Sequence, residues 1–172
     1  DLVDGKCPDT GGPVERVQED NYFFKMSAYQ DRLIEYMEAN RDWLVPTSRW
    51  AEVRSFLKQP LEDLSISRPK ERLSWGIPLP FNENYVTYVW FDALLNYITA
   101  IGYGEDDAMF QRWWPATHHF IGKDILTTHT VYWGTMLMAM GLPLPSRICA
   151  TGWWLVDNTK MSKSIGNVID PL

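Results

Sequence analysis

Two stretches in the first third of the chain carry apolar residues at the spacing of an amphipathic helix. The first begins at Ser27, where Ser27 and Gln30 have the spacing of a capping box. Its apolar face consists of Tyr29, Leu33, Tyr36 and Met37. The second helix is expected from about Ser48 and stops at Pro60, because proline cannot continue a helix. Its apolar face consists of Trp50, Val53, Phe56 and Leu57.

From residue 64 the pattern changes to short strands and irregular segments, interrupted by proline and glycine. Residues 85–90 are rich in β-forming side chains, so a strand is expected there. Asp92 can cap the N-terminus of the helix that follows, and Gly102 is expected to end that helix. The apolar positions of this helix are Leu94, Leu95, Ile98 and Ile101.

The last third predicts a crossover unit. Residues 119–121 read as a buried strand, 122–124 as a turn, 125–140 as a long helix and 147–151 as a second strand. A loop is expected from there to residue 170. Strand, turn, helix and strand in this order favour a parallel sheet, whose ligands bind at the carboxyl ends of the strands.

Composition narrows the class of protein. The 172 residues suit one domain, or part of a domain with an insertion. A net charge of −6 argues against a stand-alone nucleic-acid binder. Two cysteines are too few for a disulfide framework, and neither a signal peptide nor a membrane-spanning apolar run is evident. We therefore expect a cytoplasmic location and no membrane partner.

Lys160 and Lys163 lie three residues apart on the loop after the second strand. Two such ammonium groups can lie beside a polyphosphate and stabilise the negative charge that develops on a leaving pyrophosphate. The alternative is a solvated loop, which would be the better interpretation of an arbitrary pair of lysines. However, residues 160–164 are identical to the KMSKS motif of class I aminoacyl-tRNA synthetases, so the segment resembles their ATP-binding loop.

Residues 119–125 read HFIGKDI. A glycine here lets a ligand approach the backbone, and Asp124 can accept hydrogen bonds from ribose hydroxyls. Asp124 could equally be a helix N-cap, and the two roles are compatible. The segment resembles the methionyl-tRNA synthetase family specifically. That resemblance implies nucleotide binding by Gly122, Asp124, Lys160 and Lys163, and a catalytic role for Lys123 beside the two loop lysines.

The same resemblance implies a pocket for methionine. Its two walls would come from the helix after residue 90 and the helix after Asp124, where side chains four apart share a face. An apolar pocket with aromatic edges, a phenol and an imidazole suits a polarizable thioether. The alternative is an aromatic core with one satisfied histidine. The implied lining residues are Trp90, Ala93, Leu94, Tyr97, Ile125, His129 and Trp133, whereas His118 is expected to be structural.

A further match covers residues 63–68 and 75–78, which are similar to the family's D-x-S-I-S-R and W-G-[IV]-P segments. The resemblance implies that Arg68 faces the active site, paired with acidic or phosphate groups, as a catalytic residue. The alternative is a surface charge.

Two departures from the family pattern are visible. Cys7 begins a C-P-x-[CH] knuckle, but Thr10 stands where a second ligand belongs, so we expect no zinc. No H-x-G-H tetrapeptide occurs, so the half of the active site that carries the phosphate-flanking histidines is not in this sequence. We therefore expect that half, which the resemblance places before this segment, as a partner.

The expected fold is α/β: residues 1–62 form the distal part of a connective insertion, and residues 63–172 form the second half of a Rossmann-type parallel-sheet domain. The expected function is methionine–tRNA ligase, which uses ATP and Mg²⁺ to activate methionine and transfers it to tRNA(Met). Two rival hypotheses stay open. One is another class I synthetase with a different pocket, and the other is a non-catalytic binding module derived from a synthetase.

Overall fold

The computed structural model describes residues 12, 14 and 18–169. Its α-helices are α1 (Gln30–Ala39), α2 (Thr47–Phe56), α3 (Val89–Thr99), α4 (Asp107–Trp113) and α5 (Trp133–Ala139). Shorter turns are η1 (Met26–Tyr29), η2 (Trp114–Ala116), η3 (Lys123–Ile125) and the π-helical η4 (Thr128–Tyr132). The strands are β1 (Phe23–Phe24), β2 (Leu44–Val45), β3 (Leu64–Ser65), β4 (Ser67–Pro69), β5 (Pro78–Leu79), β6 (Asn82–Thr87), β7 (His118–Gly122), β8 (Arg147–Thr151), β9 (Leu155–Val156) and β10 (Thr159–Lys160). No described helix is long and apolar enough to cross a membrane.

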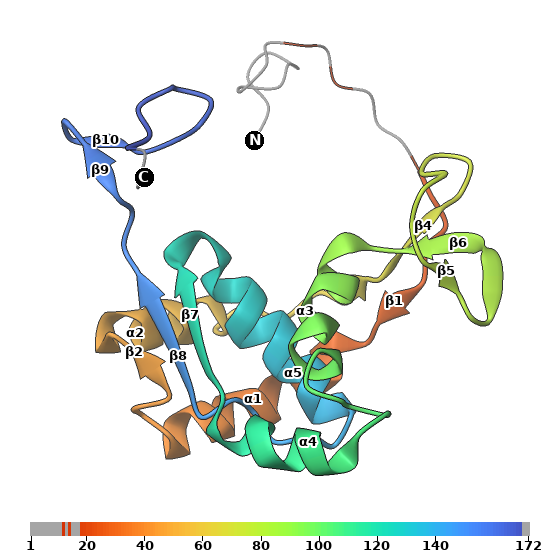
Figure 1. The fold of residues 1–172 in the computed structure, drawn as a ribbon, viewed down its shortest axis with the longest axis horizontal. Helices are drawn as coiled ribbons and strands as arrows, with labels where there is room; N and C mark the ends of the chain where they lie inside the picture. The colour runs from red at the N-terminus through yellow and green to blue at the C-terminus, as the bar shows by residue number, and fades with distance from the viewer. Residues whose placement is uncertain (1–11, 13, 15–17, 170–172) are drawn as a thin grey trace.

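The central sheet has the strand order β2-β8-β7, and both pairings are parallel. The helical segment that contains η4 and α5 connects β7 to β8 and runs between β7 and α3 in Figure 1. This confirms the predicted crossover unit and the α/β fold class. The pairing of β2 with β8 was not predicted, because a two-residue strand has no alternating pattern to detect.

One face of the central sheet is buried under helices. Leu44, Ile148 and Ala150 of the sheet are at most 2% exposed. They pack with Leu33 and Met37 of α1 in one hydrophobic cluster, to which α2 also contributes. The cluster therefore joins residues on both sides of the expected boundary at residue 62. The division into an insertion and a catalytic half stays a prediction, but the core is continuous across it.

The opposite face of the sheet is uncovered within the described part of the chain. Val45, Cys149 and Phe120 form a row across the three strands, since Cys149 is in register with each of the other two. Phe120 is 76% exposed, and Val45 is 37% exposed. Parallel sheets in proteins are normally covered on both faces, so this apolar row is unusual for a complete domain.

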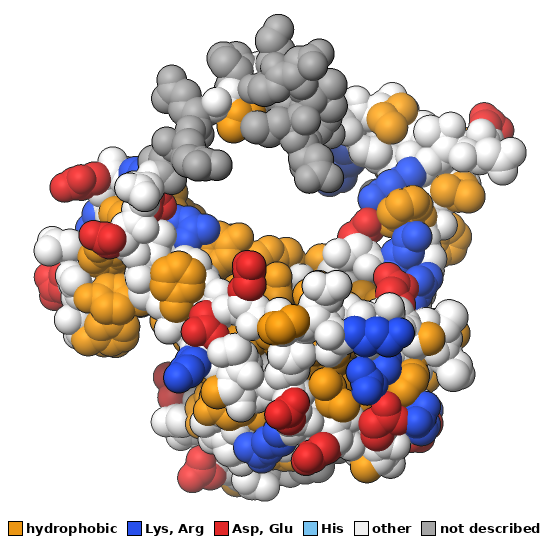
Figure 2. All heavy atoms as spheres, turned by 180° about the vertical axis from the view of Figure 1, so that it is seen from behind, with side chains coloured by type: hydrophobic (Ala, Val, Ile, Leu, Met, Phe, Trp, Pro, Cys, Tyr) orange, Lys and Arg blue, Asp and Glu red, His pale blue; other side chains and the backbone are white. Residues whose placement is uncertain are grey.

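Two arms extend from the central body on the same side of the molecule (Figure 1). The first, here called the β4–β6–β5 arm (residues 67–87), is a three-stranded antiparallel sheet. The second, here called the KMSKS arm (residues 152–169), carries the hairpin of β9 and β10. Figure 2 shows from behind that an open space separates the two arms above the central body.

The hairpin in the KMSKS arm corrects the expected loop. Its turn residues Asp157 and Asn158 have φ values of 50° and 62°, as a type I′ turn requires. The sequence signal was missed because each strand has only two residues and the turn lacks glycine. As a result, Lys160 lies at the end of a strand and not in the middle of a loop.

Three expected helix details were wrong. Ser27 and Gln30 form no capping box, because Ser27 bonds Asp63 and the Gln30 side chain bonds the backbone of residues 57, 59 and 61. Asp92 lies in the first turn of α3 and is not its N-cap, since the helix already begins at Val89. Phe56 is 46% exposed, although it was placed on the buried face of α2.

Candidate functional site

The site is positioned by the carboxyl ends of β7 and β8. Gly122 ends β7 and is in register with Thr151, which ends β8. The chain continues from Gly122 into η3, which carries Lys123 and Asp124, and from Thr151 into the KMSKS arm. Two segments that are about 30 residues apart therefore meet at one edge of the sheet, as the parallel topology predicts.

Asp124 is the centre of a polar cluster at this edge. Its Oδ1 atom accepts a hydrogen bond from Lys160 Nζ at 3.0 Å and one from Trp153 Nε1 at 2.8 Å. Lys123 Nζ lies 3.7 Å from the centroid of the Trp153 ring, and Lys160 Nζ lies 4.5 Å from it. The structure thus brings together Lys123, Asp124 and Lys160 from the predicted set, and it adds Trp153, which sequence reasoning missed.

The electrostatics of the cluster favour the carboxylate form of Asp124. The hydrogen bond from Lys160 lowers the pKa of the Asp124 carboxyl, and the bond from Trp153 and the charge of Lys123 lower it further. Asp124 is therefore an anion that only accepts hydrogen bonds at neutral pH. This is the state that a ligand for ribose hydroxyls needs.

A shallow pocket of about 290 Å³ adjoins Asp124. Its lining residues come from both segments: Gly122, Asp124, Thr151, Gly152, Trp153, Trp154, Lys160 and Met161. Two of these residues are glycines, which leave backbone open to a ligand, and two are tryptophans. These features suit a planar, polar ligand such as a nucleoside.

The other lysine of the motif is separate from this cluster. Lys163 is exposed on the turn that follows Met161, and no ion pair to it is found among the described residues. Asn167 holds this turn closed, because its Oδ1 accepts from the Ser162 N–H at 2.8 Å and its Nδ2 donates to the Lys160 carbonyl at 3.2 Å. The spacing of the lysines alone did not indicate a role for Asn167.

A second group of candidate residues forms an aromatic cluster below the first. The Tyr97 ring lies 4.2 Å from that of His119, 5.6 Å from that of His129 and 6.1 Å from that of Trp133, centroid to centroid. Three of these four residues were predicted for the methionine pocket. His119 was not, although it belongs to the HFIGKDI segment, because its burial could not be distinguished from that of a core residue.

Hydrogen bonds fix the protonation of both imidazoles. His129 Nδ1 lies 2.9 Å from the Ile125 carbonyl, so it carries the proton, and Nε2 accepts from the Tyr97 hydroxyl at 2.8 Å. His119 Nε2 accepts from Trp133 Nε1 at 3.2 Å. Burial, with a smaller contribution from His129, lowers the pKa of His119 to about 4. Burial also lowers the pKa of His129, so both rings are neutral at pH 7.

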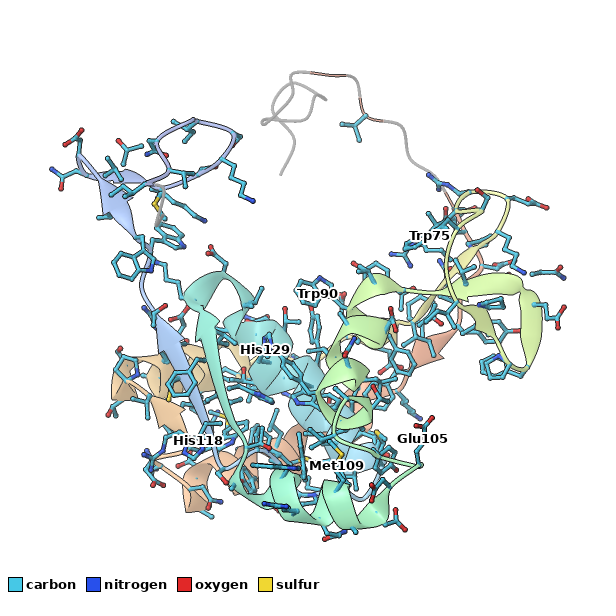
Figure 3. The ribbon with its side chains drawn as sticks, viewed as in Figure 1. Trp75, Trp90, Glu105, Met109, His118 and His129 are labelled. Carbon is cyan, nitrogen blue, oxygen red and sulfur yellow. The ribbon has the colours of Figure 1, made fainter. Side chains whose placement is uncertain are left out.

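The remaining predicted pocket residues are distributed differently. Leu94 is 1% exposed and packs with Ile98 in the core. Ala93 is exposed, and Trp90 is half-buried on the side of α3 that faces His129 (Figure 3). Ile125 packs against the other core cluster. The expected helical step from Ile125 to Trp133 is interrupted by the π-helical turn η4, which widens the helix at His129.

No ion pair between Arg68 and an acidic group is found among the described residues. Its Nη1 donates to Ser65 Oγ at 2.8 Å and to the Ser67 carbonyl at 2.7 Å, and its guanidinium lies 4.3 Å from the centroid of the Tyr88 ring. It belongs to the β4–β6–β5 arm, across the open space from the KMSKS arm (Figure 1). The expected acidic or phosphate partner of Arg68 therefore stays a prediction.

The expectation about zinc concerns Cys7 and Thr10, which lie outside the described residues. Among the residues that are described, no group of three or more His, Cys, Asp or Glu side chains has the arrangement of a metal site.

Comparison with known proteins identifies the family. The family model for tRNA synthetases class I (M) matches residues 1–172. The methionine–tRNA ligases of Clostridium acetobutylicum and Rickettsia conorii are 57% and 52% identical to the chain. These matches cover 99% and 98% of this chain but 27% and 33% of those proteins.

A crystal structure of Mycobacterium tuberculosis methionyl-tRNA synthetase bound by methionyl-adenylate superposes with a TM-score of 0.87 and 46% sequence identity. It covers 99% of this chain, which spans 34% of that one. The apo form of the same protein matches with a TM-score of 0.80 over 89% of this chain. With a Rossmann-type sheet, a KMSKS arm at its carboxyl edge and these relatives, the chain belongs to the class I tRNA synthetases of the methionyl family.

Proposed function

We propose that the protein to which this chain belongs activates methionine with ATP and transfers it to the 3′ end of tRNA(Met). The methionine carboxylate would attack the α-phosphate, forming a new P–O bond as the bond to the β-phosphate's bridging oxygen breaks and pyrophosphate leaves. A hydroxyl of the terminal tRNA ribose would then attack the carbonyl carbon, and AMP would leave.

The observation that carries the proposal is the Asp124–Lys160–Trp153 cluster beside the pocket at the carboxyl ends of β7 and β8. It combines an anion for ribose with a cation for phosphate at the position where parallel sheets bind nucleotides. A relative whose structure contains methionyl-adenylate supports the same assignment. A non-catalytic module would have no need to keep this arrangement together with an intact KMSKS segment.

The lysines of the chain would act mainly by charge. Lys160 and Lys163 would stabilise the pyrophosphate as it leaves, and Lys123 would add a third ammonium group close to Asp124. Lys160 would turn from Asp124 toward the phosphates. Arg68, on the facing arm, would contact the far side of the bound substrates.

The aromatic cluster would select the amino acid. Tyr97, His129 and Trp133 are neutral groups with aromatic edges, so they suit an uncharged thioether better than a charged side chain. Trp90 and Ala93 would complete the wall toward the open space, with Ile125 on the opposite helix. In the described structure the rings contact one another, so a methionine side chain would have to displace part of this packing.

Magnesium would enter with ATP, as a part of the substrate. The described residues offer no cluster of acidic or imidazole ligands, so the phosphates themselves would hold the ion and the lysines would complement its charge. The absence of zinc and a cytoplasmic location stay predictions.

The proposal is tested in the complete polypeptide by methionine-dependent ATP–pyrophosphate exchange and by pre-steady-state adenylate formation. Lys163→Ala should slow adenylate formation about a hundredfold, equivalent to about 3 kcal/mol, because it removes a preorganised charge contact in the transition state. The methionine KM should change little, since the lysine is remote from the aromatic cluster.

Lys58→Ala is the matched control, because Lys58 is an exposed lysine that follows α2 and belongs to neither cluster. It should leave both constants unchanged. If wild-type polypeptide gave no methionine-dependent exchange, the proposed function would be wrong. An unchanged adenylation rate in Lys163→Ala would remove that lysine from the mechanism.

A further inference from the structure

We propose that Trp153 is a positioning residue for the nucleotide, because it fixes the Asp124 carboxylate so that one oxygen stays directed at the ribose. The inference deepens the proposed function and rests on it. It starts from the observation that Trp153 is in contact with three predicted site residues at once, namely Lys123, Asp124 and Lys160.

Both donors to Asp124 use the same oxygen atom. Trp153 Nε1 and Lys160 Nζ donate to Oδ1, and no hydrogen bond to Oδ2 is found within the described part of the chain. Oδ2 lies toward Gly122, 4.0 Å from where a Cβ on that glycine would stand. Because Gly122 and Asp124 both line the pocket, the arrangement leaves Oδ2 free to accept from a ligand hydroxyl.

We expect Trp153, and not Lys160, to keep its bond to Asp124 when substrate binds. Lys160 sits at the end of the β9–β10 hairpin and is the lysine that phosphate would attract. Trp153 is two residues beyond the end of β8, so its tether to the sheet is short. Once Lys160 turns to the phosphates, Trp153 is the group that keeps Oδ1 in place and prevents the carboxylate from rotating.

The ring of Trp153 also has a function in this arrangement. Its faces attract the ammonium groups of Lys123 and Lys160, at 3.7 Å and 4.5 Å from the ring centroid. The ring thereby keeps both cations near the pocket before ATP arrives. The next residue, Trp154, is 76% exposed and has none of these contacts among the described residues, so the role belongs to one tryptophan of the pair.

The test uses the complete polypeptide and compares ATP with 2′-deoxy-ATP and 3′-deoxy-ATP in pyrophosphate exchange. Trp153→Phe keeps a ring and removes the indole donor. We expect its KM for ATP to rise roughly tenfold, the effect of losing a hydrogen bond to a charged group, while kcat stays within about twofold. The KM for the deoxy nucleotide that lacks the recognised hydroxyl should change little, so discrimination between it and ATP should fall.

A loss of general structural integrity would raise all KM values together and would not change this ratio. Trp113→Phe is the matched control, since Trp113 is also exposed, at 51%, and has the Arg112 guanidinium 5.1 Å from its ring centroid, but lies in α4. It should keep the wild-type ratio. Trp153→Leu, which also lacks the donor, repeats the test in a second variant, and melting temperatures confirm that each variant folds.

Asp124→Asn separates this inference from the proposed function. If wild-type enzyme is active and Asp124→Asn loses nucleotide discrimination while both Trp153 variants retain it, the positioning role of Trp153 is overturned and the proposed function stands. Wild-type enzyme that does not distinguish ATP from either deoxy nucleotide also overturns the inference. If wild-type enzyme shows no methionine-dependent exchange, the proposed function itself fails.

Discussion

At the scale of single residues, the aromatic cluster shows how neutral hydrogen bonds can shape a pocket. His129 donates to the Ile125 carbonyl, so its remaining nitrogen has to accept, and Tyr97 is the donor that it finds. The two buried imidazoles are thereby held uncharged side by side. A wall of this kind would tolerate a thioether and disfavour a cationic side chain, which could find no carboxylate there.

Tyr97→Phe tests this wall in the complete synthetase. The change removes the hydroxyl that satisfies His129 Nε2, which should cost about 1 kcal/mol and raise the methionine KM roughly fivefold. The KM for ATP should stay unchanged. The structure favours this variant over Trp133→Ala, because Trp133 is fully buried and its truncation would destabilise the core by about 3–5 kcal/mol. An unchanged methionine KM in Tyr97→Phe would exclude the hydroxyl from substrate binding.

The buried His119 predicts a dependence of stability on pH. Its pKa is about 4 in the folded protein and about 6.5 in the unfolded chain, so the unfolded chain binds the extra proton more readily. The contribution to the free energy of unfolding is present above pH 6.5 and is lost as pH falls toward 4. We expect a loss of about 3 kcal/mol across this window.

Denaturant unfolding at several pH values measures this effect, with His119→Gln as the comparison. The variant should have a flatter pH profile between pH 4 and 6.5. His118→Gln is the control, because His118 is exposed at the start of β7, and this variant should keep the wild-type slope. Equal slopes in all three proteins would contradict the assignment to His119.

At the scale of elements, the strongly periodic parts of the chain were predictable and the short or irregular parts were not. The crossover from β7 to β8 and the apolar face of α3 followed from residues such as Ile121, Leu94 and Ile98. The π-helical turn could not be anticipated, because residues 129–131 and 133–138 are all buried, so the helix has no single apolar stripe that would reveal a shift in phase. Strand β2 and the β9–β10 hairpin are too short for any period.

The end of α3 provides a prediction at this scale. Gly102 has φ +92°, and a Cβ there would stand 2.8 Å from the Asp106 carbonyl oxygen. Gly104 has a similar φ of +82°, but nothing lies within 4 Å of the Cβ position. Both alanine variants should lose about 1–2 kcal/mol from the unfavourable backbone conformation, and Gly102→Ala should lose about 1–3 kcal/mol more from the clash.

Thermal and denaturant unfolding of the complete polypeptide compares the two alanine variants. Gly104→Ala is the matched control, since it shares the backbone strain and lacks the contact. Equal destabilisation by the two substitutions would mean that the Asp106 backbone moves away from the added Cβ at little cost. The contact with Asp106 would then not be a reason for glycine at position 102.

At the scale of the whole molecule, the described chain is a sheet with one covered face and two arms around an open space. The chain spans about a quarter to a third of its relatives. We expect that a 172-residue polypeptide of this sequence, made alone, shows no methionine-dependent ATP–pyrophosphate exchange. The reason is that its sequence has no H-x-G-H segment to contact the phosphates opposite the KMSKS arm.

The same exchange assay tests this directly, with the complete synthetase as the positive control. Exchange by the 172-residue polypeptide would show that this polypeptide is sufficient for adenylate formation.

Contiguous motifs in the sequence predicted candidate residues that the structure brings together, whereas contacts between distant residues were missed. The KMSKS and HFIGKDI segments identified Lys160 and Asp124, which the structure joins by a hydrogen bond. Trp153, His119 and Asn167 were missed because their roles come from partners that are 5–29 residues away in the sequence or from burial. The hydrogen bonds of Arg68 to Ser65 and Ser67 were missed for the same reason, since only the folded arm shows which oxygens it reaches.

The uncovered row of Val45, Cys149 and Phe120 allows the exposure of this face of the sheet to be measured chemically. Cys149 is the free thiol among the described residues, and it is partly exposed between two apolar neighbours in the row. Alkylating reagents can reach it only while this face is open. The rate of its modification in the complete polypeptide, followed by mass spectrometry of the peptide that contains it, would therefore report whether other parts of that polypeptide cover this face of the sheet.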